Sequence, residues 1–352
     1  VNLIPLFPAV HAAGNIFFLN KDRDMLSKEG IAMSKKVVNR QQRKENIVGY
    51  AFISPALICY LLFIAFPFFL TIILSFTEFN FLKVKSLAKL GKYIDWIGFE
   101  NFVEAFKDRR FVAGIKNTFV YAIATVPASI IIGIILAYLL NGRIFAKKLL
   151  RLAFFIPYIS SIVALGAVFK FLFREDGLVN NFLMNLGWVN APVKWTVEAS
   201  VTKLPISLLV IWTSLGYVLI VYMAALQNVP RTLYEAATID GANGVQKFFR
   251  ITLPNLKQIV LFTLVTSMIG GLQMFDIPAL YNNGTSQNSA TETIAVYIYD
   301  NFLNANLSNY GNAASASVIL FMITSILGSI CFAINRDKDV KHKKSKKTSK
   351  LL

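Results

Sequence analysis

The sequence has few charged, sulfur-containing and imidazole side chains for its length. Of its 352 residues, 16% are charged, two are cysteines and two are histidines. Cys59 and Cys331 lie within long apolar stretches, and His11 and His342 have no neighbouring ligand residues. We therefore expect neither a disulfide nor a metal site. A G-x-x-x-x-G-K-[S/T] phosphate-binding loop is also missing, so we expect no nucleotide site in this chain.

What the sequence has in abundance is apolar residues. They make up 55% of the chain, and the mean hydropathy is +0.55. They gather into blocks about as long as a bilayer core is thick, roughly 20 residues of helix. Six blocks stand at 47–76, 118–140, 149–173, 205–226, 256–281 and 313–334. This pattern predicts an all-α membrane protein with six transmembrane helices.

The basic residues that give a net charge of +17 are concentrated near the two ends of the chain. Cytoplasmic segments of membrane proteins are enriched in Lys and Arg, so we predict that both termini are cytoplasmic. The predicted segments are 1–46 before the membrane domain and a basic tail, 336–352, which lies against anionic headgroups. The predicted external loop 77–117 departs from this rule, since it holds eight basic residues. This placement favours a membrane surface over nucleic acid as the partner of the positive charge.

The first 32 residues raise the question of where translation starts. The chain begins with valine, and Met33 is followed at once by Ser34-Lys35-Lys36. Residues 1–32 lack the basic start and continuous apolar core of a signal peptide. We therefore expect translation to start at Met33, and the mass of the intact protein tests this.

The most specific pattern lies in a polar segment between the fourth and fifth apolar blocks. Glu235-Ala236-Ala237 is followed after three residues by Gly241, and after nine more by Ile251-Thr252-Leu253-Pro254. The pattern resembles the E-A-A loop of permease subunits in binding-protein-dependent ABC importers. The fuller form, Ile239-Asp240-Gly241-Ala242, resembles the carbohydrate-importing branch.

Other segments carry the same resemblance, which covers roughly residues 47–335. They are Trp96–Phe102, Arg110-Phe111, Asn117-Thr118, Gly177–Asn180 with Trp195, Phe275-Asp276, and Thr291-Glu292-Thr293. One segment departs from the family, because Asn282-Asn283-Gly284-Thr285 stands where sugar permeases often have Gly-Gly-Pro.

The resemblance implies a type I ABC importer permease fold over 47–335, with a cytoplasmic coupling loop at 227–255. It assigns contact with the ATPase to Glu235, Ala236, Ala237, Asp240, Gly241, Leu253 and Pro254. The implied partners are a second homologous permease, two ATP-binding subunits and an extracellular solute-binding protein. The chain would then be a multi-pass protein of a bacterial cell membrane that needs no cofactor and is not an enzyme, since ATP is bound by the partners.

The residues of the loop predict two short helices joined at a glycine. Tyr234–Ile239 is compatible with a helix, with Glu235 in its first turn at the positive end of the dipole. Gly241 can adopt the positive φ that ends a helix. Val245, Phe248 and Phe249 recur at helical spacing and predict an apolar face on a second short helix.

The substrate is less defined than the coupling loop. Polar residues within the fourth and fifth blocks are candidates for lining a cavity: Thr213, Ser214, Tyr217, Ser267 and Gln273. Ordinary helix packing explains each of them as well. The resemblance implies a sugar or oligosaccharide taken up by alternating access. The alternatives are a permease for another solute, such as glycerol phosphate, and a carrier driven by an ion gradient.

Overall fold

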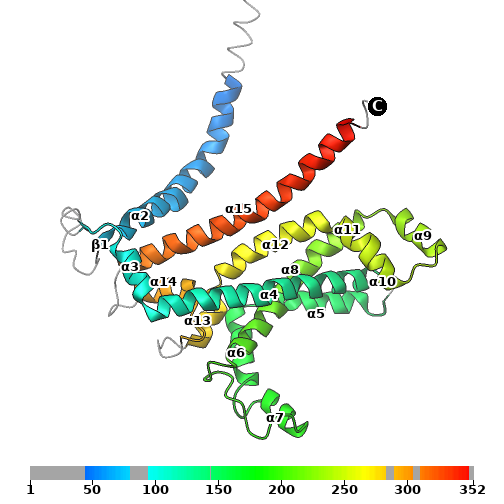
Figure 1. Ribbon diagram of the computed structural model, residues 1–352, viewed down its shortest axis with the longest axis horizontal. Coiled ribbons are helices and arrows are strands. Elements are labelled where there is room, and N and C mark those ends of the chain that lie inside the picture. The colour runs from blue at the N-terminus through cyan, green and yellow to red at the C-terminus, as the bar shows by residue number, and fades with distance from the viewer. Residues whose placement is uncertain (1–43, 80–93, 143, 283–288, 304–309, 349–352) are drawn as a thin grey trace, which may run out of the picture. The chain divides into compact units, whose positions relative to one another are not determined.

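The computed structural model describes residues 44–79, 94–142, 144–282, 289–303 and 310–348 (Figure 1). Side chains of the last helix are described as far as Ala333. The expected translation start at Met33 and the side chains of the basic tail lie outside these residues. The predicted segment boundaries at residues 46 and 335 stay predictions.

The chain divides into two compact units, Val1–Phe69 and Leu70–Leu352. The described part of the first unit is helical and includes a π-helical turn, η1 (Leu61–Ala65). The helix α2 (Phe66–Ser75) begins in the first unit and ends in the second.

The second unit consists of helices and one small sheet. Its longer helices are α4 (Arg109–Asn141), α5 (Lys147–Ile159), α6 (Ile162–Leu172), α8 (Lys203–Gln227), α12 (Lys257–Leu272) and α15 (Tyr310–Thr348). Its shorter helices outside the polar loop are α3 (Glu100–Lys107), α7 (Leu178–Asn185), α13 (Asp276–Asn282) and α14 (Ile294–Leu303). The strand β1 (Thr77–Phe79) pairs antiparallel with β2 (Ile94–Trp96), an addition to the all-helical prediction.

Five helices are long and apolar enough to cross a membrane among the residues described. They span Lys44–Ser75, Arg109–Asn141, Lys203–Gln227, Lys257–Tyr281 and Tyr310–Ala333. The pair α5 and α6 makes a sixth span if both halves are counted together. Each of these spans overlaps one of the six predicted blocks, so the predicted fold class is confirmed, while the cytoplasmic position of the termini stays a prediction.

The third apolar block, 149–173, was predicted to be a single helix, and the structure differs. Its two halves, α5 and α6, meet at an angle of 103°. The helix α5 ends because Ser160 adopts an extended backbone with ψ of 155°, and Ser161 precedes the first turn of α6. Neither apolar composition nor block length reports such a change in one residue's backbone.

The helix α4 packs against both α8 and α12, whereas α8 and α12 contact each other only slightly (Figure 1). An apolar cluster lies between them, with Ile134 of α4, Val218 and Tyr222 of α8, and Leu256 among its buried members. At Gly133, a Cβ atom would lie 2.3 Å from Cγ1 of Val218, so only glycine allows α4 and α8 to approach this closely.

Candidate functional site

A cavity of about 650 Å³ opens between helices α4, α5, α6, α8, α12 and α13. All five side chains predicted to face a cavity line it: Thr213, Ser214, Tyr217, Ser267 and Gln273. They come from α8 and from α12 with the turn that follows it. The structure therefore brings the five together, and their contact with substrate stays a prediction.

The structure adds lining residues that the sequence did not single out. They include Thr125 and Ser129 of α4, Tyr158 of α5 and Thr266 of α12. Thr125 and Ser129 are four residues apart, so they share one face of α4. Their spacing in the sequence predicts this shared face. Which face of α4 lines the cavity, however, depends on how the helices pack.

The hydroxyl groups of the cavity are placed to accept hydrogen bonds. The Thr125 hydroxyl donates to the carbonyl of Tyr121 at 2.8 Å, and the Ser129 hydroxyl donates to the carbonyl of Val126 at 2.9 Å. Each hydroxyl has one proton and two lone pairs, so its oxygen keeps acceptor capacity after this donation. The cavity therefore offers acceptors to a ligand rich in hydroxyl donors.

Two further properties limit what the cavity accommodates. The rings of Tyr158 and Tyr217 lie 6.3 Å apart with an interplanar angle of 34°, so they form an aromatic wall. Asp276 is the only ionisable acid or base among the described lining residues, apart from the tyrosines. The described lining thus has aromatic, hydroxyl and amide groups and no cation.

The polar segment between α8 and α12 folds into an exposed knob, defined here as Arg231–Asn255. It contains α9 (Arg231–Ile239), α10 (Gly244–Lys247), a π-helical turn η4 (Phe248–Thr252) and α11 (Leu253–Asn255). Gly241 has φ of 73°, as predicted, and separates α9 from α10. Asn243 and Gln246 form a reciprocal capping box at the start of α10.

Most side chains of the predicted coupling residues are exposed or half-buried. Glu235, Ala236 and Asp240 are exposed, and Ala237 is half-buried. Pro254 is exposed at the start of α11, and Leu253 packs against the apolar cluster. The expectation that Glu235 lies in the first turn was wrong, because α9 begins four residues earlier, at Arg231.

The knob also exposes large apolar side chains. Ile239 is 87% exposed, Val245 is 66% exposed and Phe249 is 59% exposed. Phe248, by contrast, packs against the apolar cluster and anchors the knob to the helices. Of the three residues predicted to form one apolar face, two are therefore exposed and one is turned toward the core.

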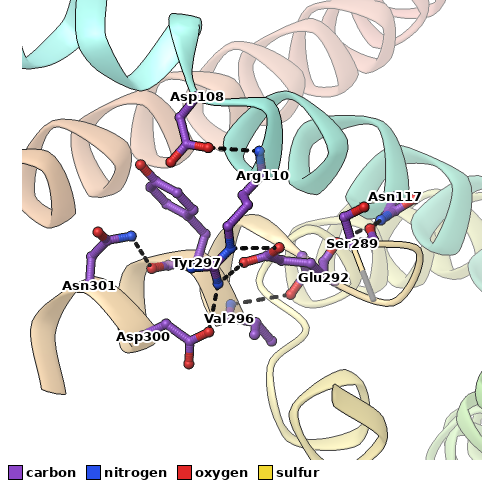
Figure 2. A network of polar contacts seen from close by, with 10 residues as sticks. Asp108, Arg110, Asn117, Ser289, Glu292, Val296, Tyr297, Asp300 and Asn301 are labelled. Atoms are coloured by element: carbon purple, nitrogen blue, oxygen red, sulfur yellow. Dashed lines mark hydrogen bonds and ion pairs between the residues drawn. The ribbon is translucent and has the colours of Figure 1, made fainter. Parts of the chain in front are cut away.

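The opposite end of α4 carries a network of polar contacts (Figure 2). The guanidinium of Arg110 donates to both carboxylate oxygens of Glu292 and, at 2.7 Å, to the carboxylate of Asp300. It also lies over the ring of Tyr297, 5.8 Å from the centroid. Asp108 caps α4 by accepting the backbone N–H of Arg110 at 2.8 Å.

Burial dominates the electrostatics of this network. The Glu292 side chain is 1% exposed, and this burial raises the pKa of its carboxyl group, while Arg110 acts in the opposite direction. The amide of Asn117 donates to the carbonyls of Ser289 and Glu292 at 2.7 and 2.9 Å. The Thr118 hydroxyl accepts the backbone N–H of Ile294 at 3.0 Å.

This network joins two segments that are far apart in the sequence and that both resemble segments of the permease family. Arg110 and Asn117 bond to Glu292, and Thr118 bonds to Ile294, although more than 170 residues separate the partners. The Thr293 hydroxyl also donates to the carbonyl of Met274, a residue that lines the cavity. The polar network is therefore continuous with the rim of the cavity.

No group of three or more His, Cys, Asp or Glu side chains capable of holding a metal occurs within the described ranges. Cys59 is exposed and Cys331 is half-buried, and each has a free thiol. The expected absence of a cofactor stays a prediction.

Comparison with known proteins supports the resemblance found in the sequence. The pattern of a family described as "Binding-protein-dependent transport system inner membrane component" matches residues 129–337. The lactose transport system permease protein LacF of Rhizobium radiobacter is 32% identical over 299 residues, which cover 84% of this chain and 97% of LacF. The arabinooligosaccharide transport system permease protein AraP of Halalkalibacterium halodurans is 32% identical over 286 residues, covering 80% of this chain and 86% of AraP.

A solved structure shares the fold. A bacterial ABC transporter involved in the import of the acidic polysaccharide alginate contains a chain with a TM-score of 0.72 and 24% identity. The match covers 84% of this chain and 98% of that one. The predicted permease fold is therefore confirmed.

Proposed function

Because the chain belongs to the family of inner membrane components of binding-protein-dependent transport systems, we propose that it is the permease subunit of an ABC importer for a sugar or oligosaccharide. One observation carries this proposal. The chain runs from α8 directly into the exposed knob and from the knob into α12, and both helices line the cavity. A force applied to the knob would thus reach two walls of the cavity.

In this proposal the knob faces the cytoplasm and docks on an ATP-binding subunit. Glu235, Ala236, Ala237, Asp240 and Gly241 lie on or beside α9, and the alanines allow close approach of a partner surface. The neighbouring exposed side chains of Ile239 and Val245 would be buried on docking. ATP is bound and hydrolysed by the partner subunits, and their closure drives the cavity between two orientations.

A sugar suits the cavity better than a charged solute. Hydroxyl and amide groups match the donors of a polyhydroxylated ligand, and the rings of Tyr158 and Tyr217 offer flat faces for stacking. A phosphate ester such as glycerol phosphate would be expected to meet a cation, and the described lining supplies only the carboxylate of Asp276. The names of the lactose and arabinooligosaccharide permeases support the same substrate class.

The complete importer in this proposal has several chains. A second homologous permease completes the pathway, two ATP-binding subunits supply energy, and an extracellular solute-binding protein delivers the sugar. The assembly resides in a bacterial cell membrane. A carrier driven by an ion gradient would leave the exposed knob without a role.

Uptake measurements with two proline variants test the proposal. Deleting the gene from its host should abolish uptake of one sugar in a panel of radiolabelled lactose and arabinooligosaccharides. Gly241→Pro should also reduce that uptake to background while the protein still inserts, because proline requires φ near −65° and this position has 73°.

Gly244→Pro is the matched control for this experiment. Gly244 is the first residue of α10, where proline is tolerated, and the preceding Asn243 has the extended backbone that proline favours. Its uptake should stay within about twofold of wild type, since position N1 needs no N–H donor and proline keeps the backbone carbonyl of this residue. Normal uptake in Gly241→Pro would overturn the coupling role of the knob.

A further inference from the structure

The helix α4 reaches the knob although the chain does not connect them. Two cavity-lining helices, α8 and α12, continue into the knob at its two ends. At its own end α4 leads instead to α5, yet it contributes Thr125, Val126 and Ser129 to the cavity. A displacement of the knob therefore reaches this wall of the cavity only through side-chain contacts.

We propose that Tyr138 is a positioning residue that makes α4 follow the knob, so that a third wall of the cavity moves together with the other two. This inference rests on the proposed function, and it adds a residue outside the polar loop to the coupling machinery.

Tyr138 holds the knob at two points. Its hydroxyl donates to the backbone carbonyl of Gly244 in α10 at 2.9 Å. Its ring meets the ring of Phe248 in η4 edge-on, with centroids 5.1 Å apart and an interplanar angle of 62°. Among the described residues, this hydrogen bond is the only one between α4 and the knob.

Both residues of the knob that Tyr138 contacts are held in place. Gly244 follows the capping box of Asn243 and Gln246, which fixes the first turn of α10. Phe248 packs against the buried cluster shared by α4 and α8. Because each contact meets a fixed element, a displacement of the knob has to pull or push the Tyr138 side chain.

The distance from Tyr138 to the cavity suits transmission along a helix. Ser129 lines the cavity and precedes Tyr138 by nine residues in the same continuous helix, which is about 13 Å at 1.5 Å per residue. At its far end α4 is held by Arg110, Asn117 and Thr118. One end of α4 is thus tied to the polar network and the other to the knob.

A competing route for the same motion exists. The helix α4 packs against α8, as at the close contact of Gly133 with Val218, and against α12, and both helices are continuous with the knob. If this packing carried all of the displacement, the contact of Tyr138 would be redundant. Replacing its hydroxyl alone distinguishes the two routes.

The experiment uses the full importer, with its partner permease, ATP-binding subunits and solute-binding protein, reconstituted in lipid vesicles. Tyr138→Phe removes the hydroxyl and keeps the ring, and Phe248→Leu keeps apolar bulk and removes the ring-edge contact. Uptake of the radiolabelled sugar identified in the panel and hydrolysis of ATP are measured on the same vesicles. Tyr60→Phe, an exposed tyrosine of the first unit, is the matched control.

We expect Tyr138→Phe to lower uptake by about two- to tenfold, the range for loss of a single hydrogen bond. ATP hydrolysis should remain near wild type, so the ATP consumed for each sugar should rise by the same factor. The ATP-binding subunits should still co-purify in wild-type amounts, because the exposed face of the knob is unchanged. Phe248→Leu should raise the ratio of ATP to sugar in the same direction.

Three outcomes would overturn the inference. One is a wild-type ratio of ATP to sugar in both variants, which assigns transmission to the packing of α4 against α8 and α12. Another is loss of the ATP-binding subunits from Tyr138→Phe, which makes Tyr138 a docking determinant. The third is an equal change in Tyr60→Phe. Normal uptake in Gly241→Pro would instead refute the proposed function, so the two failures are distinguishable.

Discussion

The two ends of α4 are built on opposite principles. At the Arg110 end, charged groups are withdrawn from solvent, and Glu292, which is 1% exposed, meets its partner within the same chain. At the Tyr138 end, the knob leaves Ile239 and Phe249 more than half exposed. The first end is completed by the chain itself, whereas the second presents apolar surface that the chain does not cover.

This difference separates stability from function along one helix. A buried ion pair that loses one partner is costly, because the remaining charge cannot regain its hydration. An exposed apolar side chain contributes little to folding, since it stays in water in the isolated chain. Substitutions in the polar network should therefore reduce mainly stability, and substitutions on the knob should reduce mainly transport.

A large loss of stability is expected from Arg110→Met. It leaves the buried carboxylate of Glu292 without its guanidinium, at a cost of about 3–5 kcal/mol. Thermal unfolding of the purified protein in detergent measures the effect. Arg174→Met is the matched control, because the ion pair of Arg174 with Asp176 is exposed on both sides and contributes about 0–1 kcal/mol. Equal destabilisation by the two variants would break the comparison.

A smaller loss is expected from Gly241→Ala. An alanine at φ of 73° is strained by about 1–2 kcal/mol. Because the knob is exposed, we expect this strain to loosen the junction of α9 and α10 more than the rest of the protein. Hydrogen exchange of the α9 and α10 amides measures the loosening. A Cβ atom added at Gly244 has no close neighbour, and φ there is not positive, so Gly244→Ala should leave exchange unchanged. Equal loosening in both variants would contradict the strain assigned to position 241.

The smallest effect on stability is expected from Ile239→Ser. This side chain is 87% exposed, so the free energy of unfolding should change by less than about 0.5 kcal/mol. Co-purification of the ATP-binding subunits should nevertheless fall, because the variant removes apolar surface that docking would bury. Phe111→Ser, at a fully buried position of the Arg110 end, should instead destabilise the protein. A stable Phe111→Ser variant, or an Ile239→Ser variant with full co-purification, would contradict the comparison.

Several features were predictable because they depend on residues close together in the chain. The apolar blocks follow from composition over about 20 residues, and the junction at Gly241 follows from a glycine between two helix-forming stretches. The grouping of Thr213, Ser214 and Tyr217 on α8 follows from helical periodicity. The bend at Ser160 was missed, because it depends on the backbone of one residue in a uniformly apolar block.

The sequence by itself determined the membrane class, the six apolar blocks and the position of the polar loop, since these are properties of local order along the chain. Only the tertiary structure decided which distant side chains meet. Arg110 bonds to Glu292 across 182 positions of sequence, and Tyr138 bonds to Gly244 across 106. Such pairs depend on how helices cross and approach, as at the close contact of Gly133 with Val218. Helix packing thus placed the cavity between two unlike ends of α4 and turned Tyr138 toward the knob.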